Sequence, residues 1–389
     1  MLNALVDLGP VGDGDLIAEA DRYVESVRTL MGRGDAGLVR QAEVEVQKSE
    51  KVFEFEPDGK ATLRAAGHVW SAGKFETPTL GMLRERAERA RVGRKSTQEP
   101  RLRFWVLDGA AAATDIGSLQ AHAGENCLFQ VASQLNCLEA TGPFVCPVSH
   151  YLTDPTQGPR ASVSAFPGTL LRHYAAPGLN GERFVQATNA AQIELLGEVC
   201  SPEVARAQNG YLMDDCVHNA PAFLEALKEN FNSVKVGFHD DVEVVLGGNW
   251  SGGVVGRPRI GQVFTSTVAG GGYGGENLGD YFVPLCREML KAAYVGTLLS
   301  AAAAEKSVVV LTLIGGGVFG NPIEVIWEAI EFALATVEPL LAVNMDVFVN
   351  GRDLSKRLDQ KTMMSPVGKY GGLMVVFDKD SSVRALVRA

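Results

Sequence analysis

The sequence lacks the excess of positive charge that nucleic-acid binding requires. Its 46 Asp and Glu residues outnumber its 36 Lys and Arg residues, and the formal net charge is −10. A protein that binds a phosphate backbone carries a basic domain or patch, so we expect no nucleic-acid partner. A single nucleotide can still be held by backbone N–H groups, which need no positive side chain.

Long apolar runs are also missing. Glu305 and Lys306 interrupt the longest apolar stretch before it reaches the length that crosses a bilayer, so we expect no membrane partner. Residues 1–10 carry no basic flank ahead of an apolar core, which argues against a secretory signal. From these two absences we expect a cytoplasmic protein.

Neither the cysteines nor the histidines show the spacing of metal ligands. The six histidines are scattered, and the six cysteines contain no CxxC pair: Cys127, Cys137, Cys146, Cys200, Cys216 and Cys286. Reduced and mostly buried thiols are the expectation for a cytosolic chain of this kind. We predict no metal site and no resident cofactor.

What the sequence does contain is a glycine-rich loop between a strand and a helix. Residues 308–314 are apolar and largely β-branched, which is typical of a strand buried on both faces. Asn321 and Pro322 suit the N-cap and the first position of a helix over residues 323–334, and Asn321 is also a candidate ligand contact. The residues between offer close backbone approach and free N–H groups: Gly315, Gly316, Gly317, Val318, Phe319 and Gly320. We predict a phosphate or diphosphate site here; a tight connection without a ligand is the alternative.

The rest of the chain indicates the α/β class. From residue 101 onward short apolar runs alternate with helical patterns, as in a mixed central sheet covered by helices. A strong helix pattern runs over residues 283–304. A basic, polar linker at residues 91–100 marks the expected boundary between an N-terminal extension, residues 1–98, and a main domain, residues 99–389.

The N-terminal extension reads as a mixture of helices and a hairpin. Helical patterns cover residues 16–31 and 79–91. Residues 44–55 partly alternate between apolar and polar, which indicates a strand, and Asp58-Gly59 indicates a hairpin turn before the next strand.

A nicotinamide dehydrogenase is one interpretation of the glycine-rich loop. Gly315, Gly317 and Gly320 fit the GxGxxG pattern, and Asp346 lies roughly where an acid would bind the ribose. That pattern normally opens a domain of about six strands. Here fewer than 70 residues follow Gly320, so the dehydrogenase is the weaker alternative.

The same loop resembles the second phosphate loop of macrodomains, in the stretch 311–322, LTLIGGGVFGNP. Upstream, residues 126–139, NCLFQVASQLNCLE, and residues 156–159, TQGP, resemble motifs of a macrodomain-like branch. That branch lies close to poly(ADP-ribose) glycohydrolases and to some ADP-ribosyl-arginine hydrolases, and residues 70–76, WSAGKFE, resemble another piece of it. The resemblance covers residues 45–380. It implies a three-layer α/β/α fold with ADP-ribose bound in a cleft at the strand ends.

What the resemblance implies for activity is either hydrolysis of an ADP-ribosyl bond or recognition alone. The glycohydrolase signature is a triple glycine followed within several residues by Gln and two consecutive Glu. Here residues 270–272 are followed by the single acid Glu276 and no Gln, and residues 315–317 only by Glu324. This departure favours removal of a single ADP-ribose over cleavage of the polymer. The expected partner is ADP-ribose or an ADP-ribosylated protein, and the oligomeric state stays open.

Amide side chains are candidates for holding the nucleoside parts. Asn126, Gln130, Gln134 and Asn136 interrupt an apolar segment, and Gln157 lies in the TQGP motif. If the segment is a helix, Gln130 and Gln134 share one face. Amides donate and accept, which suits adenine edges and ribose hydroxyls. The alternative is a set of buried structural amides that pin the loop to the sheet.

A second glycine-rich loop, residues 270–280, supplies the candidate acids. Within this loop, Gly271 and Gly272 are further candidate ligand contacts. Cleavage of a glycosidic bond passes through an oxocarbenium-like state and needs a carboxyl group to position water or exchange a proton. Asp280 is the first candidate and Glu276 the second; alternatively Asp280 only begins the following helix.

Overall fold

The computed structural model describes residues 2, 13–94, 98–178, 181–187, 191–274, 276–379 and 382–389. Within these residues the middle layer is one mixed sheet of 11 strands. In sheet order the strands are β1 (Phe53–Phe55), β2 (Ala61–Ala65), β3 (His68–Glu76), β8 (Gly237–Glu243), β9 (Arg259–Thr265), β5 (Cys127–Ala132), β10 (Val308–Thr312), β11 (Met345–Gly351), β4 (Leu102–Asp108), β12 (Met374–Phe377) and β13 (Val383–Val387). A separate two-stranded sheet joins β6 (Ala176–Pro177) to β7 (Arg183–Phe184).

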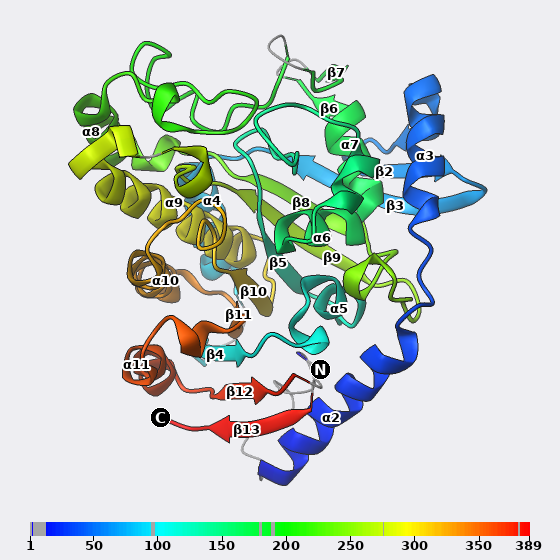
Figure 1. Ribbon diagram of the computed structural model, residues 1–389, viewed down its shortest axis with the longest axis vertical. Helices are drawn as coiled ribbons and strands as arrows, with labels where there is room; N and C mark the ends of the chain where they lie inside the picture. The colour runs from blue at the N-terminus through cyan, green and yellow to red at the C-terminus, as the bar shows by residue number, and fades with distance from the viewer. Residues whose placement is uncertain are drawn as a thin grey trace.

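Helices cover both faces of the large sheet. The longer helices of the described chain are α2 (Asp13–Leu30), α3 (Gly37–Lys48), α4 (Leu80–Gly93), α5 (Ile116–Ala121), α6 (Gln157–Ser164), α7 (Phe166–Tyr174), α8 (Ala220–Glu229), α9 (Phe282–Ala303), α10 (Ile323–Val337) and α11 (Gln360–Tyr370). Helices α9 and α10 lie on one side of the sheet and α5, α6 and α7 on the other (Figure 1). The predicted α/β class with a mixed, helix-covered sheet is confirmed.

The centre of the sheet is parallel, and this arrangement positions the site. Strands β9, β5, β10, β11 and β4 pair in parallel, so their carboxyl ends share one edge. Strand β10 is apolar and buried because it runs in the middle of the sheet under helices. Helix α9 is buried along most of its length because it packs against α4, α8 and α10 as well as the sheet.

Several predictions about the elements are confirmed. The helix expected over residues 283–304 is α9. The helix expected over residues 79–91 is α4, and the hydroxyl of Thr79 caps it by accepting from the Met82 N–H at 3.2 Å. The Asp58-Gly59 turn joins β1 to β2 as an antiparallel hairpin.

Two segment predictions are wrong. Residues 44–48 form the last turns of helix α3 rather than a strand, because Val39 and Val46 pack on one helical face. The conditional helix that would place Gln130 and Gln134 on one face does not form: Gln130 lies in strand β5, whose residues are buried on both sides, and Gln134 lies in the loop after it. Alternation is weak evidence in so short a segment, and a continuous apolar run fits either element.

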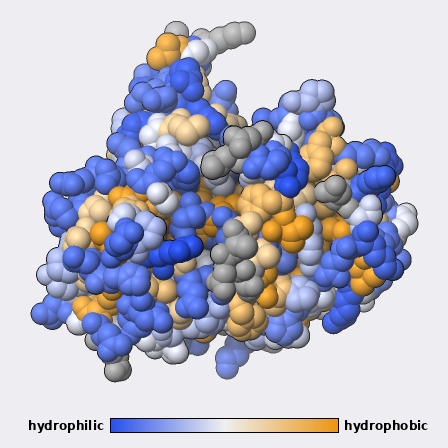
Figure 2. All heavy atoms as spheres, turned by 90° about the horizontal axis from the view of Figure 1, so that it is seen from above, coloured by the Kyte–Doolittle hydropathy of each residue, from blue (hydrophilic) through white to orange (hydrophobic). Residues whose placement is uncertain are grey.

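The N-terminal hairpin continues the main sheet. Strand β3 pairs antiparallel with β8, with Phe75 opposite His239. The boundary expected near residue 98 stays a prediction. Among the described residues no helix combines the length and the apolar character needed to cross a membrane. Viewed from the top of Figure 1, the surface is mainly hydrophilic with apolar residues gathered near the middle (Figure 2).

Candidate functional site

A cavity of about 370 Å³ opens at the carboxyl ends of the parallel strands β5, β10 and β11. The segments that follow these three strands line it, together with the first turn of α6 and two tyrosines from other loops. Ligands of open α/β sheets bind outside the carboxyl ends of the strands. The cavity therefore lies where this fold class places its ligands.

The glycine-rich loop after β10, residues 315–320, forms the floor of the cavity, and we call it the amide loop. Gly315 and Gly320 have φ values of +70° and +63°, which favour glycine. The Gly316 N–H donates to Leu313 O at 3.0 Å. In the described part of the chain, four other N–H groups donate to no protein acceptor: those of Gly315, Gly317, Val318 and Phe319. Such a run of free N–H groups ahead of a helix is an anion-binding arrangement.

The second glycine-rich loop supports the amide loop from behind. The Gly270 N–H donates to Phe319 O at 3.0 Å. A Cβ on Gly271 would come within 2.7 Å of Val318 O, so the two backbones approach closely only because glycine stands there. Neither Gly271 nor Gly272 lines the cavity. Their predicted contact with the ligand stays a prediction; Gly271, together with Gly270, packs against the backbone of the amide loop.

Asn321 has a different role from the expected N-cap. Helix α10 begins at Ile323 with Pro322 as its N-cap. The buried side chain of Asn321 accepts from Thr267 Oγ1 at 2.9 Å and donates to Val268 O at 2.9 Å. These bonds tie the end of the amide loop to the segment after β9. Asn321 does not line the cavity, and its predicted contact with a ligand stays a prediction.

A carboxyl group that the sequence argument did not select enters the cavity. Glu139 is only 2% exposed, and its Oε1 has no hydrogen-bond partner among the described residues. Burial raises the pKa of Glu139 well above its usual value; the positive charge of Arg172 opposes this rise and Asp154 adds to it. The site thus holds a carboxyl whose neutral, proton-carrying form is favoured.

The loop between β5 and α6 fixes the position of Glu139. The Glu139 N–H donates to Tyr151 Oη at 3.1 Å. The side chain of Gln134 accepts from the Ala140 N–H at 2.9 Å, and Asn136 Oδ1 accepts from the Leu138 N–H at 3.1 Å. A buried unpaired carboxyl is costly, so it persists here only because the backbone around it is held on both sides.

The amide side chains are used mainly inside the protein. Gln130 donates to Thr297 Oγ1 at 2.8 Å and accepts from the Thr312 N–H at 3.2 Å, so it joins β5 to α9 and β10. Gln157 lines the cavity, but its side chain bonds Ile116 N at 2.8 Å and Asp115 Oδ1 at 3.2 Å. Together with Gln134 and Asn136, these contacts match the alternative of structural amides; any contact with a ligand stays a prediction.

Three other residues singled out from the sequence lie elsewhere. Asn126 precedes β5 and is exposed at its amino end, roughly 20 Å from the carboxyl end by the rise of the strand. Asp346 is the second residue of β11, at the same far edge, where it pairs with Arg103 at 2.7 Å. Asp280 is exposed in a 3₁₀ turn and does not line the cavity. The side chain of Glu276 lies outside the described part of the structure, so both catalytic assignments stay predictions.

Aromatic rings form one wall of the cavity. The rings of Tyr211, Tyr273 and Phe319 contact one another with centroids 5.2, 5.5 and 5.7 Å apart. Tyr211 Oη donates to Ala140 O at 2.9 Å, which holds the wall beside the Glu139 loop. Aromatic side chains at a cavity wall suit contact with a sugar or a base.

The segment after β11 supplies two positively charged side chains to the cavity. Arg352 and Arg357 both line the cavity. The Arg357 Nη2 lies 3.4 Å from the point that a Cβ on Gly316 would occupy, so this guanidinium reaches the amide loop. An anion on the loop would meet backbone N–H groups and a cation together.

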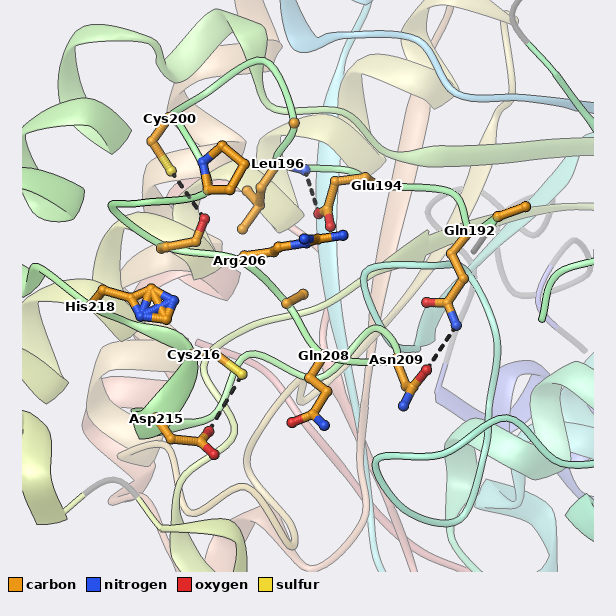
Figure 3. Close-up of a pocket in the computed structure, with 15 residues that line it drawn as sticks. Gln192, Glu194, Leu196, Cys200, Arg206, Gln208, Asn209, Asp215, Cys216 and His218 are labelled. Atoms are coloured by element: carbon orange, nitrogen blue, oxygen red, sulfur yellow. Dashed lines mark hydrogen bonds between the residues drawn. The ribbon is translucent and has the colours of Figure 1, made fainter. Parts of the chain in front are cut away.

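A larger cavity of about 760 Å³ lies within the long segment 191–218 (Figure 3). Arg206 and Glu194 point toward each other across it, and burial raises the pKa of Glu194. None of its described lining side chains has a buried polar atom without a partner. The smaller cavity, which holds the unpaired Glu139 and the free N–H groups, is therefore the candidate site. Across the described residues no cluster of three or more His, Cys, Asp or Glu could hold a metal ion.

No protein-family model matches the chain, and no curated protein matches it. Poly(ADP-ribose) glycohydrolase from Thermomonospora curvata aligns with a TM-score of 0.40 and 13% identity over 79% of this chain and 91% of that chain. The apo enzyme from Deinococcus radiodurans aligns with a TM-score of 0.40 and 10% identity over 76% and 93%. The T267K mutant of the Deinococcus radiodurans enzyme, in complex with ADP-ribose, aligns with a TM-score of 0.38 and 12% identity over 76% of this chain and 95% of that chain.

With TM-scores below 0.5, these likenesses carry no argument about this chain. The resemblance to ADP-ribosyl-arginine hydrolases finds no support in them.

Proposed function

We propose that the cavity binds ADP-ribose and that the chain hydrolyses the bond joining it to a modified protein. One observation carries the proposal: the same cavity is lined by the four residues of the amide loop whose N–H groups have no protein acceptor and by Glu139, whose buried Oε1 has no partner among the described residues. The N–H groups suit a diphosphate, and the Glu139 carboxyl suits proton transfer at an adjacent sugar. The macrodomain-like sequence motifs agree with this ligand.

Binding follows from the amide loop and its surroundings. Hydrogen bonds to a charged group contribute about 1.5–3 kcal/mol each, and about 8 kcal/mol corresponds to a micromolar Kd. Three or four N–H groups on the diphosphate, with Arg357 beside them, are enough for that affinity. The rings of Tyr211 and Phe319 would cover a ribose or base face.

Hydrolysis uses the carboxyl of Glu139 in its protonated form, which burial favours by raising its pKa. As the bond between the ribose C1″ and the leaving atom breaks, Glu139 donates its proton to that atom. Water then adds to the oxocarbenium-like C1″, and the proton that the water loses returns to Glu139. The reaction needs no redox cofactor. Because the paired-glutamate signature is missing, we propose mono-ADP-ribosylated protein, rather than polymer, as the substrate.

Calorimetry with ADP-ribose, ADP and NAD tests the binding step. In Gly317→Val the new Cβ meets nothing within 4 Å, so we expect the fold to persist while the side chain occupies the space over the amide loop. We expect ADP-ribose and ADP binding to be lost. Gly93→Val is the matched control, since its Cβ also meets nothing within 4 Å but lies at the end of α4. Equal affinity of Gly317→Val and wild type would remove the diphosphate from this loop.

Release of ADP-ribose from a mono-ADP-ribosylated protein tests the chemical step. General acid catalysis contributes roughly 10²–10⁴-fold, so Glu139→Gln should lose that factor in turnover and still bind ADP-ribose. A wild-type rate in Glu139→Gln would show the mechanism to be wrong. The departure from the glycohydrolase signature favours one other function, a non-catalytic reader. Stoichiometric capture of the substrate by the wild type, without release of ADP-ribose, would establish the reader.

A further inference from the structure

We propose that Asn350 recognises a ribose hydroxyl on the adenosine half of the ligand and so discriminates against deoxyribose at that position. The inference rests on the proposed binding of ADP-ribose and assigns a specificity-determining residue to the same cavity. Asn350 is the next-to-last residue of β11, is 5% exposed and lines the cavity. Its Oδ1 is buried and has no hydrogen-bond partner among the described residues.

The order of the strands indicates which half of the ligand Asn350 meets. In the sheet, β10 lies between β5 and β11. Glu139 follows β5, so the ribose carbon that reacts lies on the β5 side. The diphosphate lies over the amide loop after β10. The other half of the ligand, the adenosine, must then extend across the end of β11.

Distance along the sheet selects the ribose rather than the base. Neighbouring strands are about 4.8 Å apart, so Asn350 is one strand spacing from the strand that carries the diphosphate site. A ribose attached directly to the phosphate spans that distance. The adenine, one ring further on, would lie beyond β11, toward β4.

The chemistry of the two groups is complementary. A side-chain amide presents an acceptor and donors, and a ribose hydroxyl both donates and accepts. No hydrogen bond from the Asn350 side chain to a described residue is present, so the amide is free to turn either edge to the ligand. A buried polar group left without a partner is unfavourable in the free protein, and a ligand hydroxyl would supply the missing bond.

The experiment is a cycle that removes the hydroxyl and the amide separately and together. Calorimetry measures the Kd of ADP-ribose and of its 2′-deoxy and 3′-deoxy adenosine analogues for wild type and for Asn350→Leu. We expect one analogue to bind wild type about tenfold more weakly, the effect of one good hydrogen bond. The same analogue should bind Asn350→Leu less than about twofold more weakly than ADP-ribose does.

Two further variants keep the result interpretable. Asn350→Asp retains an acceptor and should retain discrimination against the deoxy analogue, which a purely structural role would not produce. Asn232→Leu, an exposed position away from the cavity, is the control and should behave as wild type. If wild type binds all three ligands and Asn350→Leu weakens them equally, the inference fails while the proposed function stands. If wild type binds no ADP-ribose, both fail.

Discussion

Oε2 of Glu139 lies 2.7 Å from the point that a Cβ on Gly158 would occupy. The same point is 2.4 Å from Ala132 O, at the end of β5. Gly158 has no left-handed backbone requirement, so its glycine is needed for space alone. The first turn of α6 can approach both the strand end and the carboxyl only because Gly158 has no side chain.

Gly158→Ala should therefore impair both the fold and the site. Overpacking of this kind costs about 1–3 kcal/mol, and relief requires either α6 or the Glu139 carboxyl to move. We expect a lower free energy of unfolding and a lower rate of ADP-ribose release. Denaturant unfolding and a turnover assay measure the two effects. Gly93→Ala is the control. Equal stability of the two variants would show that the fold accepts a side chain at position 158.

Glu139→Gln should be more stable than wild type at neutral pH. Because the pKa of Glu139 is raised in the folded state, that state binds more protons than the unfolded chain above the usual carboxyl pKa of 4.5. Wild-type stability thus falls as the pH rises from 4.5 toward the raised pKa. Glutamine has no such dependence, so the stability gain of the variant should grow with pH across that window.

Unfolding of both proteins in urea at several pH values measures this gain. A gain that stays constant with pH would mean that Glu139 titrates normally. Loss of turnover together with a gain in stability is the pattern expected of a functional, strained carboxyl.

His239 should make the protein sensitive to acid. Arg172 Nη1 donates to His239 Nδ1 at 2.9 Å, and His239 Nε2 donates to Ala72 O at 2.6 Å, so the imidazole is held neutral. Burial, and then the charge of Arg172, lower the pKa of His239 well below 6.5. The unfolded chain therefore binds the proton first, and folding stability should fall as the pH drops below about 6.5.

In His239→Gln this part of the acid sensitivity should disappear. The pKa values of His122 and His173 are also lowered by burial, so some sensitivity should remain. Thermal unfolding between pH 5 and 8 compares the slopes. Identical slopes for variant and wild type would contradict the assignment.

Asn321→Ala should loosen the amide loop. The variant leaves the buried Val268 O and Thr267 Oγ1 without their partner, a loss of about 1–3 kcal/mol for each unsatisfied group. We expect a lower unfolding midpoint and a weaker affinity for ADP-ribose. Asn321→Asp keeps the acceptor for Thr267, so it should lose less stability and less affinity for ADP-ribose than Asn321→Ala. Unchanged affinity in Asn321→Ala would show that the loop is held by its glycine contacts alone.

A structural feature of this protein is predictable from the sequence alone when the residues that determine it lie close together in the chain. The strand, glycine loop and helix over residues 308–337 were predictable because hydrophobic run, glycines and helix start lie together in the chain. The exact N-cap was not, because Asn321 makes a tertiary contact that no local pattern reveals.

Glu139 was missed for a related reason. It lies within residues 126–139, but its surroundings are set by Gly158, Tyr151 and Arg172, which are further along the chain. The candidate acids Asp280 and Glu276 were selected by proximity to glycines. For the amides in and around β5, both ligand contacts and structural roles stayed open, because side-chain chemistry alone cannot distinguish a ligand from a neighbouring segment.

The amide loop is made of main-chain groups, and main-chain groups do not change charge between mildly acidic and mildly alkaline conditions. Capture of the nucleotide should consequently persist across that range, whereas bond cleavage should stop once Glu139 has lost its proton. At sufficiently high pH the same molecule would hold its substrate without consuming it, which makes alkaline buffer a means of trapping the intact complex.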